Sequence, residues 1–256
     1  MKLLFLGSGG SMGIPVIGCK CAVCSSSSSY NKRLRPSVLI TEGKKRYLID
    51  VGPDYRTQAL KHGIDTLDGL LLTHTHYDHI AGLDELRIYT FVQKKPIPCL
   101  LSRETLEELK IRYHYFLPPF EADEVHATKL KFQILDGDQG STNFEGLPVT
   151  YISYDQLGMK VNGFRLGLLA YVTDILDFEE EVFDSLKGIE ILVISGRRWE
   201  KSKAHLSLDD AIKFSKKTGA KKTYFTHISH EIDHEETNGT LPEGFSLSYD
   251  GLELIL

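Results

Sequence analysis

The chain has 256 residues, of which 41% are apolar and 25% are charged, a composition typical of a globular protein large enough to fold without disulfides. Its net charge of −5 argues against the basic surface of a general nucleic-acid binder, although a small phosphate ester could still be attracted by bound metal ions. No apolar run approaches the roughly 20 residues of a membrane span, and the apolar start over residues 1–6 is too short for a signal peptide, so we expect a cytoplasmic protein.

The first part of the chain is expected to consist mainly of strands. A short apolar run over Lys2–Leu6 predicts a strand that enters a glycine-rich turn at Gly7–Gly13. Two strand-like runs within residues 37–51 predict a hairpin. A helix is expected between Pro53 and Gly63, because proline favours the first turn of a helix and glycine its end. The apolar run Leu67–Thr73 then predicts a buried strand.

Strands and helices mix in the rest of the chain. Helices are expected over Ile80–Thr90, Ser102–Arg112, Asp177–Leu186 and Ser207–Thr218. Strands are expected over Lys129–Leu135, Val149–Tyr154, Gly163–Leu166, Leu169–Thr173, Ile189–Ser195, Lys222–Thr226, Phe245–Tyr249 and Leu252–Leu256. This order predicts an α/β fold with a core of two sheets, helices outside them, and a single domain over residues 1–256.

The motif His74-x-His76-x-Asp78-His79 is the strongest chemical signal in the sequence. Its four potential metal ligands directly follow the predicted Leu67–Thr73 strand, which would give the loop a rigid base. Imidazole and carboxylate ligands without thiolate suit zinc or manganese. A polar surface loop is the alternative, but four ligands at this spacing favour a metal site.

This motif resembles that of the metallo-β-lactamase superfamily, whose fold is an αββα sandwich of two mixed sheets flanked by helices. The resemblance implies a hydrolase with two catalytic divalent ions, zinc or manganese. It assigns His74 and His76 to metal one, and Asp78 and His79 to metal two.

Three further residues occur in the order that this family requires. The resemblance implies that Asp174 bridges the two metals, that His227 completes metal two, and that Asp50 supports the metal loop as a hydrogen-bond acceptor. Taken alone, Asp174 would be a turn residue and His227 a histidine at a strand end. Their position downstream of the histidine motif favours the ligand interpretation.

A second cluster is Cys19-x-Cys21-x-x-Cys24. In a reducing compartment, such a tight group of cysteines is more typical of a metal site than of disulfides. Three thiolates leave a tetrahedral zinc one ligand short, and His230 is the candidate for the fourth. The alternative is three reduced, buried thiols.

Both clusters together resemble the cyclic phosphodiesterases of the phosphonate breakdown pathway (PhnP-like proteins). Members share a structural zinc on three such cysteines and on a histidine three residues after the last catalytic ligand. The segment His227–Asn238 and the residues around Arg35 add to the resemblance, which covers nearly the whole chain. It implies one structural zinc in addition to the two catalytic ions.

His205 and Arg198 are the candidates for contact with a substrate. The resemblance implies that His205 lies over the substrate phosphate or the leaving group, where it would position the phosphate or protonate the leaving oxygen. Arg198 would contact the phosphate, or would be an ordinary surface arginine. Asp78 would orient the nucleophile in addition to binding metal two, so Asp78 and His205 are the predicted catalytic residues.

The sequence departs from the family pattern at the third ligand of metal one. The family normally supplies a histidine there, but this chain has Gln156, with Asp155 beside it. Glutamine offers only a neutral carbonyl oxygen, whereas Asp155 would be a good ligand if the loop were shifted by one residue. Metal one is therefore expected to be loosely bound, manganese-favouring or sometimes absent.

The predicted function is hydrolysis of a small phosphate diester, such as a cyclic nucleotide, by a hydroxide that bridges the two metals. One rival is a non-hydrolytic relative of the quinone-cofactor-biosynthesis type, which Gln156 favours. A tRNA or DNA nuclease is a second rival, and the lack of excess Lys and Arg weighs against it. A homodimer is compatible with the sequence, whereas membrane association and stable nucleic-acid binding are not expected.

Overall fold

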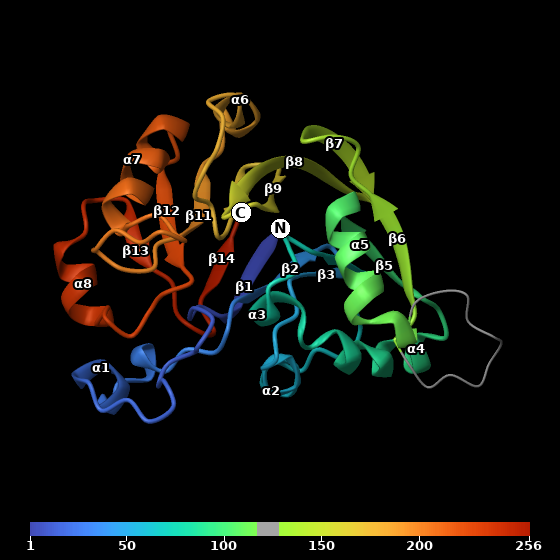
Figure 1. Ribbon diagram of the computed structural model, residues 1–256, viewed down its shortest axis with the longest axis horizontal. Coiled ribbons are helices and arrows are strands. Elements are labelled where there is room, and N and C mark those ends of the chain that lie inside the picture. Colours follow the sequence, from blue (N-terminus) through green and yellow to red (C-terminus); the bar gives the residue numbers. More distant parts are fainter. Residues whose placement is uncertain (117–127) are drawn as a thin grey trace.

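The protein was analysed as a computed structural model, which describes residues 1–116 and 128–256. These residues form two sheets of seven strands each. The sheets face each other and helices cover their outer faces (Figure 1). The predicted αββα sandwich is confirmed.

The two sheets each combine antiparallel and parallel strands. The first sheet has the order β14 (Glu253–Ile255), β1 (Lys2–Gly7), β2 (Ser37–Glu42), β3 (Lys45–Ile49), β4 (Gly69–Leu71), β5 (Ile97–Leu101) and β6 (Leu130–Ile134). The second has the order β13 (Phe245–Leu247), β12 (Lys222–Thr226), β11 (Ile191–Ser195), β10 (Leu169–Val172), β9 (Met159–Leu166), β8 (Leu147–Gln156) and β7 (Gln139–Phe144). The pairs from β3 to β6 and from β10 to β13 are parallel, and the others are antiparallel.

Several helices begin and end where the sequence predicts. Helix α7 begins after Ser207, whose hydroxyl accepts a hydrogen bond from the Asp210 N–H, and ends at Gly219 with φ 73°. The α-helices of the described residues are α1 (Ala22–Ser25), α2 (Tyr55–His62), α3 (Tyr77–Ile80), α4 (Arg87–Gln93), α5 (Arg103–Arg112), α6 (Val182–Leu186), α7 (Leu208–Thr218) and α8 (His234–Thr240). The 3-10 helices are η1 (Ser29–Asn31), η2 (Leu83–Leu86) and η3 (His114–Phe116).

The core lies in three layers because side chains alternate along each strand. Leu3 and Phe5 of β1 pack between the two sheets. Leu4 and Leu6 of the same strand face the other way and pack with residues of α2, α4 and α5. In the second sheet, Ala170 of β10 packs in a separate cluster with residues of α6 and α7. Both faces of each sheet are therefore buried, as expected for largely parallel sheets covered by helices.

The predicted helix over Ile80–Thr90 is divided into three short helical segments. Gly82 explains the break, because a Cβ at this position would lie 2.3 Å from the Gly52 carbonyl oxygen, and its N–H donates to the Val51 carbonyl oxygen at 2.8 Å. The chain must therefore approach its neighbour closely at Gly82. The predicted helix Asp177–Leu186 is also shorter, since only its second half, α6, is helical.

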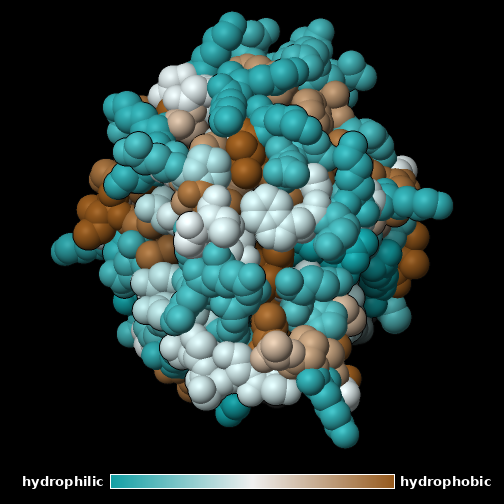
Figure 2. Space-filling model, turned by 90° about the vertical axis from the view of Figure 1, so that its left-hand side faces the viewer, coloured by the Kyte–Doolittle hydropathy of each residue, from teal (hydrophilic) through white to brown (hydrophobic). Residues whose placement is uncertain are grey.

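The face that carries α7 and α8 is largely hydrophilic (Figure 2). Apolar residues show on this face as a narrow strip down its middle and as patches at its left and right margins (Figure 2). Among the described residues, no helix is both long and apolar enough to cross a membrane. Strand β1 pairs with β14, so the first and last strands lie in one sheet, and we propose on this basis that residues 1–256 form a single domain.

Candidate metal centre

The candidate ligands all follow strand ends. Asp50 directly follows β3, the loop with His74 to His79 follows β4, Asp174 follows β10, and His227 directly follows β12. The two sheets are joined beside this loop, because Asn162 of β9 donates both its backbone N–H (2.9 Å) and its side-chain N–H (3.0 Å) to the Thr73 carbonyl oxygen. Carboxyl ends of parallel strands are where α/β folds usually place a site.

The structure brings most of the predicted ligands together. Three overlapping groups each have ligand atoms within 4.8 Å of one another: His74, His79 and Asp174; Asp78, His79 and His227; Asp174, His205 and His227. These residues are all buried. His76 belongs to none of the groups, but its Nδ1 lies 2.9 Å from His74 Nε2. The convergence joins residues that lie up to 153 positions apart, from His74 to His227.

Three of these residues have an uncommon backbone conformation. Asp50, Asp174 and His227 have φ values of 60°, 55° and 58°, in the left-handed region. This region costs roughly 1–2 kcal/mol for an L-residue other than glycine. Such conformations persist where the surrounding fold enforces them, often at functional sites. Here the left-handed turn comes where the chain leaves a strand and directs the side chain into the cluster.

Asp50 is hydrogen-bonded to both ends of the segment from Thr73 to His79. One carboxylate oxygen accepts a hydrogen bond from the Thr73 N–H at 2.9 Å, and the other accepts from the Thr73 hydroxyl at 2.8 Å. The second oxygen also lies 2.7 Å from His79 Nδ1. This contact commits the Nδ1 proton of His79 to Asp50 and leaves Nε2 facing the cluster.

His79 Nε2 shows that a cation fits here. This atom is buried and, among the described residues, has no hydrogen-bond partner, yet it lies 3.2 Å from an Asp174 oxygen and 3.4 Å from an Asp78 oxygen. A lone pair that faces two carboxylates is stable only with a proton or a metal ion between them. Burial lowers the pKa of His79, but the carboxylates of Asp78, Asp50 and Asp174 outweigh it and raise that pKa well above its ordinary value.

Asp78 is held in its ionised form. Its Oδ2 lies 3.2 Å from His227 Nε2 as well as 3.4 Å from His79 Nε2. Burial alone would raise the pKa of the Asp78 carboxyl, but the two imidazoles keep that pKa well below its ordinary value. An ionised carboxylate and imidazole nitrogens are the donors that zinc and manganese bind.

His205 lies at the edge of the same cluster. Its Nδ1 is 3.2 Å from Asp174 Oδ1, and its ring centroid is 4.9 Å from that of His227. Burial, first, and the charges of His227 and Arg197 lower the pKa of His205, although Asp174 opposes this. With Nδ1 beside a carboxylate, the other ring nitrogen is left for a substrate.

Asp155 and Gln156 take different positions from those expected of a loop. Both belong to β8, so their side chains point to opposite faces of the strand. The Asp155 carboxylate accepts a hydrogen bond from the Gly158 N–H at 2.7 Å and caps the turn to β9. Asp155 therefore does not take the place of the third ligand, and the suggested shift of the loop by one residue is wrong. Gln156 points into the cluster and lies 3.3 Å from Asp174 Oδ1.

Arg198 takes the second of its two expected positions, that of a surface arginine. Its Nη1 lies 3.3 Å from Glu231 Oε1, in an ion pair whose two side chains are both partly exposed. The preceding residue, Arg197, is instead close enough to lower the pKa of His205. The Arg197 side chain has no ion pair or hydrogen bond within the described part of the chain. Sequence reasoning missed Arg197 because two consecutive arginines in a loop carry no periodic pattern to separate them.

The structure brings the four residues Cys19, Cys21, Cys24 and His230 together. Nδ1 of His230 lies 3.3 Å from the sulfur of Cys19, 3.5 Å from that of Cys21 and 3.6 Å from that of Cys24. All are free thiols. The Cys24 backbone N–H, first, and His230 lower the pKa of Cys21 to about 6, so its thiolate is accessible near neutral pH. Three sulfurs around one imidazole nitrogen form a donor set typical of structural zinc.

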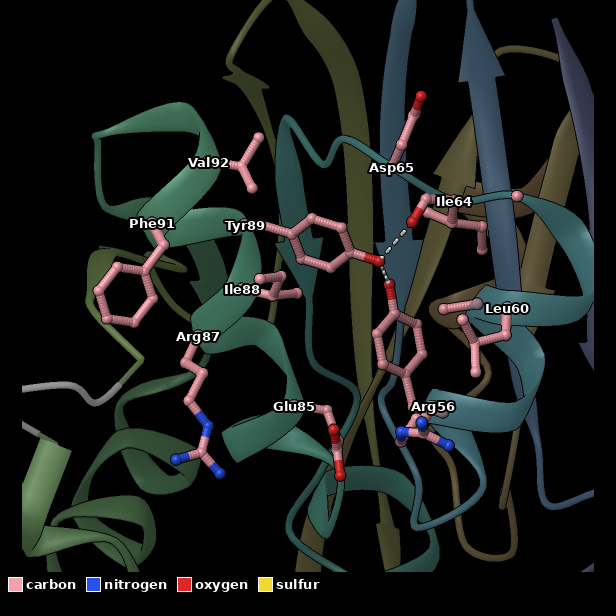
Figure 3. Close-up of a pocket in the computed structure, with 13 residues that line it drawn as sticks. Arg56, Leu60, Ile64, Asp65, Glu85, Arg87, Ile88, Tyr89, Phe91 and Val92 are labelled. Carbon is pink, nitrogen blue, oxygen red and sulfur yellow. Dashed lines mark hydrogen bonds between the residues drawn. The ribbon is translucent and has the colours of Figure 1, made fainter.

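A separate cavity of about 830 Å³ lies between α2 and α4. Apolar side chains such as Leu60, Ile88 and Val92 line it (Figure 3). Its two tyrosine hydroxyls are hydrogen-bonded, because those of Tyr55 and Tyr89 lie 2.8 Å apart and Tyr89 donates to the Ile64 carbonyl oxygen at 2.9 Å. None of the cluster ligands borders this cavity, so it is distinct from the metal centre.

Comparison with known proteins agrees with this geometry. The model of the beta-lactamase superfamily domain matches residues 45–228. The crystal structure of a diphosphatase from the PhnP family has a TM-score of 0.90 and 37% sequence identity, covering 100% of this chain and 97% of that one. Zinc-bound PqqB from Methylobacterium extorquens has the same fold, with a TM-score of 0.77, 20% identity and full coverage of both chains.

An octanoyltransferase from Porphyromonas gingivalis is 35% identical over 267 residues. That alignment covers 100% of this chain but 52% of the relative, so this chain spans about half of that protein's length. Its name therefore describes a longer protein than the shared region. The family match, the fold and the two ligand clusters lead to one conclusion: the chain belongs to the beta-lactamase superfamily and, within it, to the PhnP family.

Proposed function

We propose that this protein is a metal-dependent phosphodiesterase that hydrolyses a small phosphate ester. The observation that carries the proposal is the convergence of Asp174 and His227 with His74, Asp78 and His79, in overlapping groups of three whose ligand atoms lie within 4.8 Å of one another. Hydrolases of this superfamily and the PhnP-family diphosphatase support the reaction class. The choice of a phosphodiester as substrate is our inference.

Asp78, His79, Asp174 and His227 would hold one divalent ion, either zinc or manganese. His74 and His76, together with Asp174, would hold the second. When bound, such ions lower the pKa of water toward neutrality and neutralise charge on phosphoryl oxygens.

His205 is proposed to act on the leaving group. Its Nδ1 is held 3.2 Å from Asp174 Oδ1, which fixes the ring and leaves Nε2 free. A histidine held in this way can position a phosphate or donate a proton to the leaving oxygen. Asp78, ionised and beside His227, is proposed to orient the attacking water in addition to binding metal.

Arg197 is proposed to replace Arg198 as the residue that binds the phosphate. Gly196 precedes it at a position where a Cβ would lie 2.7 Å from both Leu208 and Phe225, so the loop is packed tightly there. The Ser229 N–H donates to the Arg197 carbonyl oxygen at 3.0 Å and ties this loop to the segment after His227. An unpaired guanidinium near the cluster suits phosphoryl oxygens, which it can bind with two parallel hydrogen bonds.

Cys19, Cys21, Cys24 and His230 are proposed to hold a structural zinc. His230 is three residues from His227, and the intervening Ile228 exchanges backbone hydrogen bonds with Ser8 and Gly10 at 3.0 and 2.8 Å. Gly10 in turn lies against the ring of His227, because a Cβ there would be 3.3 Å from its Nδ1. The zinc would therefore stabilise the segment that carries a catalytic ligand.

The proposal is tested by a panel of esters with added manganese or zinc. The panel contains bis-p-nitrophenyl phosphate, a nucleoside 2′,3′-cyclic phosphate and, because of the diphosphatase neighbour, a dinucleotide with a diphosphate bridge. We expect turnover of at least one diester, loss with a chelator, and recovery when metal returns. If only the diphosphate is turned over, the substrate is a diphosphate and not a phosphodiester.

The rival functions make different predictions in the same assay. Protein that retains its metals but turns over no member of the panel would support the non-hydrolytic alternative, which Gln156 favours. Cleavage of a tRNA precursor in preference to small esters would support a nuclease. The net charge of −5 argues against this second outcome.

A further inference from the structure

We propose that Gln156 is a positioning residue, whose amide fastens the loop that carries His205 to the Asp174 carboxylate. As a result, the half of the centre around His74 and His76 has one ligand fewer than the half around His79. This inference rests on the proposed function for its effect on catalysis. Its effect on metal binding can be tested without any substrate.

Gln156 is fixed by the strand that it ends. It is the last residue of β8 and pairs with Met159 across the turn to β9. Its side chain is 2% exposed, whereas the next residue, Leu157, is 68% exposed. A buried amide at a strand end has few rotamers to choose from, so its contacts are part of the fold.

The amide nitrogen of Gln156 joins three groups. It donates a hydrogen bond to the Ala204 carbonyl oxygen at 2.8 Å, and it lies 3.3 Å from Asp174 Oδ1 and 3.2 Å from His205 Nδ1. A carbonyl and a carboxylate oxygen both require an N–H, and a primary amide carries two. Gln156 therefore ties the backbone next to His205 to the same carboxylate oxygen that holds the His205 ring.

Other side chains would not make this set of contacts. An imidazole carries at most two N–H groups, on opposite sides of its ring, and a neutral one carries a single N–H. A glutamate would place a second negative charge against Asp174 without an N–H for Ala204. Only an amide offers two donors from one atom while remaining uncharged.

The halves of the centre are unequal as a result. Around His79, the side chains of Asp78, Asp174 and His227 supply a full set of charged and imidazole donors. Around His74, the neighbours are His76 and Asp174, and Gln156 directs one N–H group toward Asp174 and the other toward the Ala204 carbonyl oxygen. The remaining atom, Gln156 Oε1, is buried and has no partner among the described residues, and as a neutral oxygen it is a weak ligand.

The test compares Gln156→Met, Gln156→His and the control Gln133→Met. Met fills the same space without an N–H donor, and His restores an imidazole. Gln133 on β6 is a matched control, because its amide also donates a strand-to-strand hydrogen bond, to Thr142 at 2.8 Å, away from the centre. Bound zinc and manganese are counted by elemental analysis after dialysis, and the His205 ring is followed by nitrogen NMR, with His205→Ala for assignment.

We expect Gln156→Met to retain as many ions as wild type, to shift the His205 ring signals, and to lower kcat by about 10- to 100-fold with KM nearly unchanged. Wild type is expected to lose the ion of its weaker His74–His76 half during dialysis, so Gln156→His should retain one more ion per chain. Loss of an ion in Gln156→Met would identify Gln156 as a ligand and overturn the proposal. Unmoved His205 signals, or no additional ion in Gln156→His, would also overturn it.

The two hypotheses fail in different ways. If wild-type protein hydrolyses no phosphate ester, the proposed function fails, but the ion counts and the His205 signals still decide the role of Gln156. If hydrolysis is found and Gln156→Met has wild-type kcat and ring signals, only the positioning role fails.

Discussion

The two ligand clusters of this protein are built in opposite ways. The cysteine cluster takes three ligands from six consecutive residues of a loop outside the sheets, and two of its cysteines are only partly buried. The histidine–aspartate cluster takes its ligands from the ends of strands in both sheets, and nearly all of them are buried. A local cluster needs its metal to become ordered, whereas a cluster on strand ends is ordered by the fold itself. Loss of a ligand from the cysteine cluster should therefore lower the stability of the fold, and loss of a ligand from the histidine–aspartate cluster should abolish hydrolysis.

The largest effect is expected from Asp174→Asn. Asparagine tolerates the left-handed backbone at this position and keeps the shape of the side chain, but it removes the charge shared by both halves of the centre. We expect kcat/KM to fall by on the order of 10³-fold or more, since metal ions supply several kcal/mol of charge stabilisation. The melting temperature should stay near that of wild type. The exposed neighbour Asp177→Asn is the control, and wild-type turnover by Asp174→Asn would contradict the assignment.

Cys21→Ser tests the cysteine cluster. Loss of zinc should lower Tm by at least about 5 °C, because the binding energy of a structural metal is folding energy. Metal analysis should show the loss of one zinc, while the ions of the other cluster remain. The control is Ser27→Ala in the same loop. A full zinc content with unchanged Tm would remove the basis for a structural zinc.

Asp50→Asn addresses how the fold orders the histidine loop. An amide cannot accept from Thr73 and also serve His79 as a carboxylate does, so His79 would lose its fixed orientation. We expect about a 10- to 100-fold loss in metal affinity or kcat. Isothermal titration with manganese measures the first, and Asp65→Asn on the surface is the control. An affinity equal to wild type would show that the loop is ordered without Asp50.

The smallest effect is expected from Arg197→Met. Loss of a hydrogen-bonded cation at a phosphate costs roughly 1.5–3 kcal/mol, which corresponds to at least about a tenfold rise in KM. The adjacent Arg198→Met should leave KM nearly unchanged, because that guanidinium pairs with Glu231. Inhibition by inorganic phosphate gives an independent measure of the same contact. If Arg198→Met instead raised KM more than Arg197→Met, Arg198 would be the residue that binds the phosphate.

The loop from His74 to His79 could be singled out from the sequence for a physical reason. His74, His76, Asp78 and His79 are close in sequence, and their spacing after an apolar strand is itself the signal. Asp50, Asp174 and His227 were singled out only because the family resemblance implied them and their order along the chain agreed with it, since each alone is an ordinary strand-end residue. The fold brings them to the cluster, as the distances from His79 to Asp50 (2.7 Å) and Asp174 (3.2 Å) show.

Other features depend on contacts that no local pattern contains. Strand β8 extends to Gln156, and only this register decides that Gln156 faces the cluster while Asp155 caps a turn. Strands β5 and β7 were missed because one contains Pro98 and the other is mostly polar. The break at Gly82 reflects its contact with Gly52, a partner 30 residues away.

The left-handed backbone at Asp50, Asp174 and His227 limits which amino acids can be substituted at these three positions. Aspartate, asparagine and histidine are the side chains that occupy this conformation most readily after glycine. The residue types that bind metals best are therefore also among the few that the chain geometry accepts at these three points. A library randomised there and selected for folding alone, without metal or substrate, should still be enriched in these types and in glycine, and should lose valine and isoleucine first.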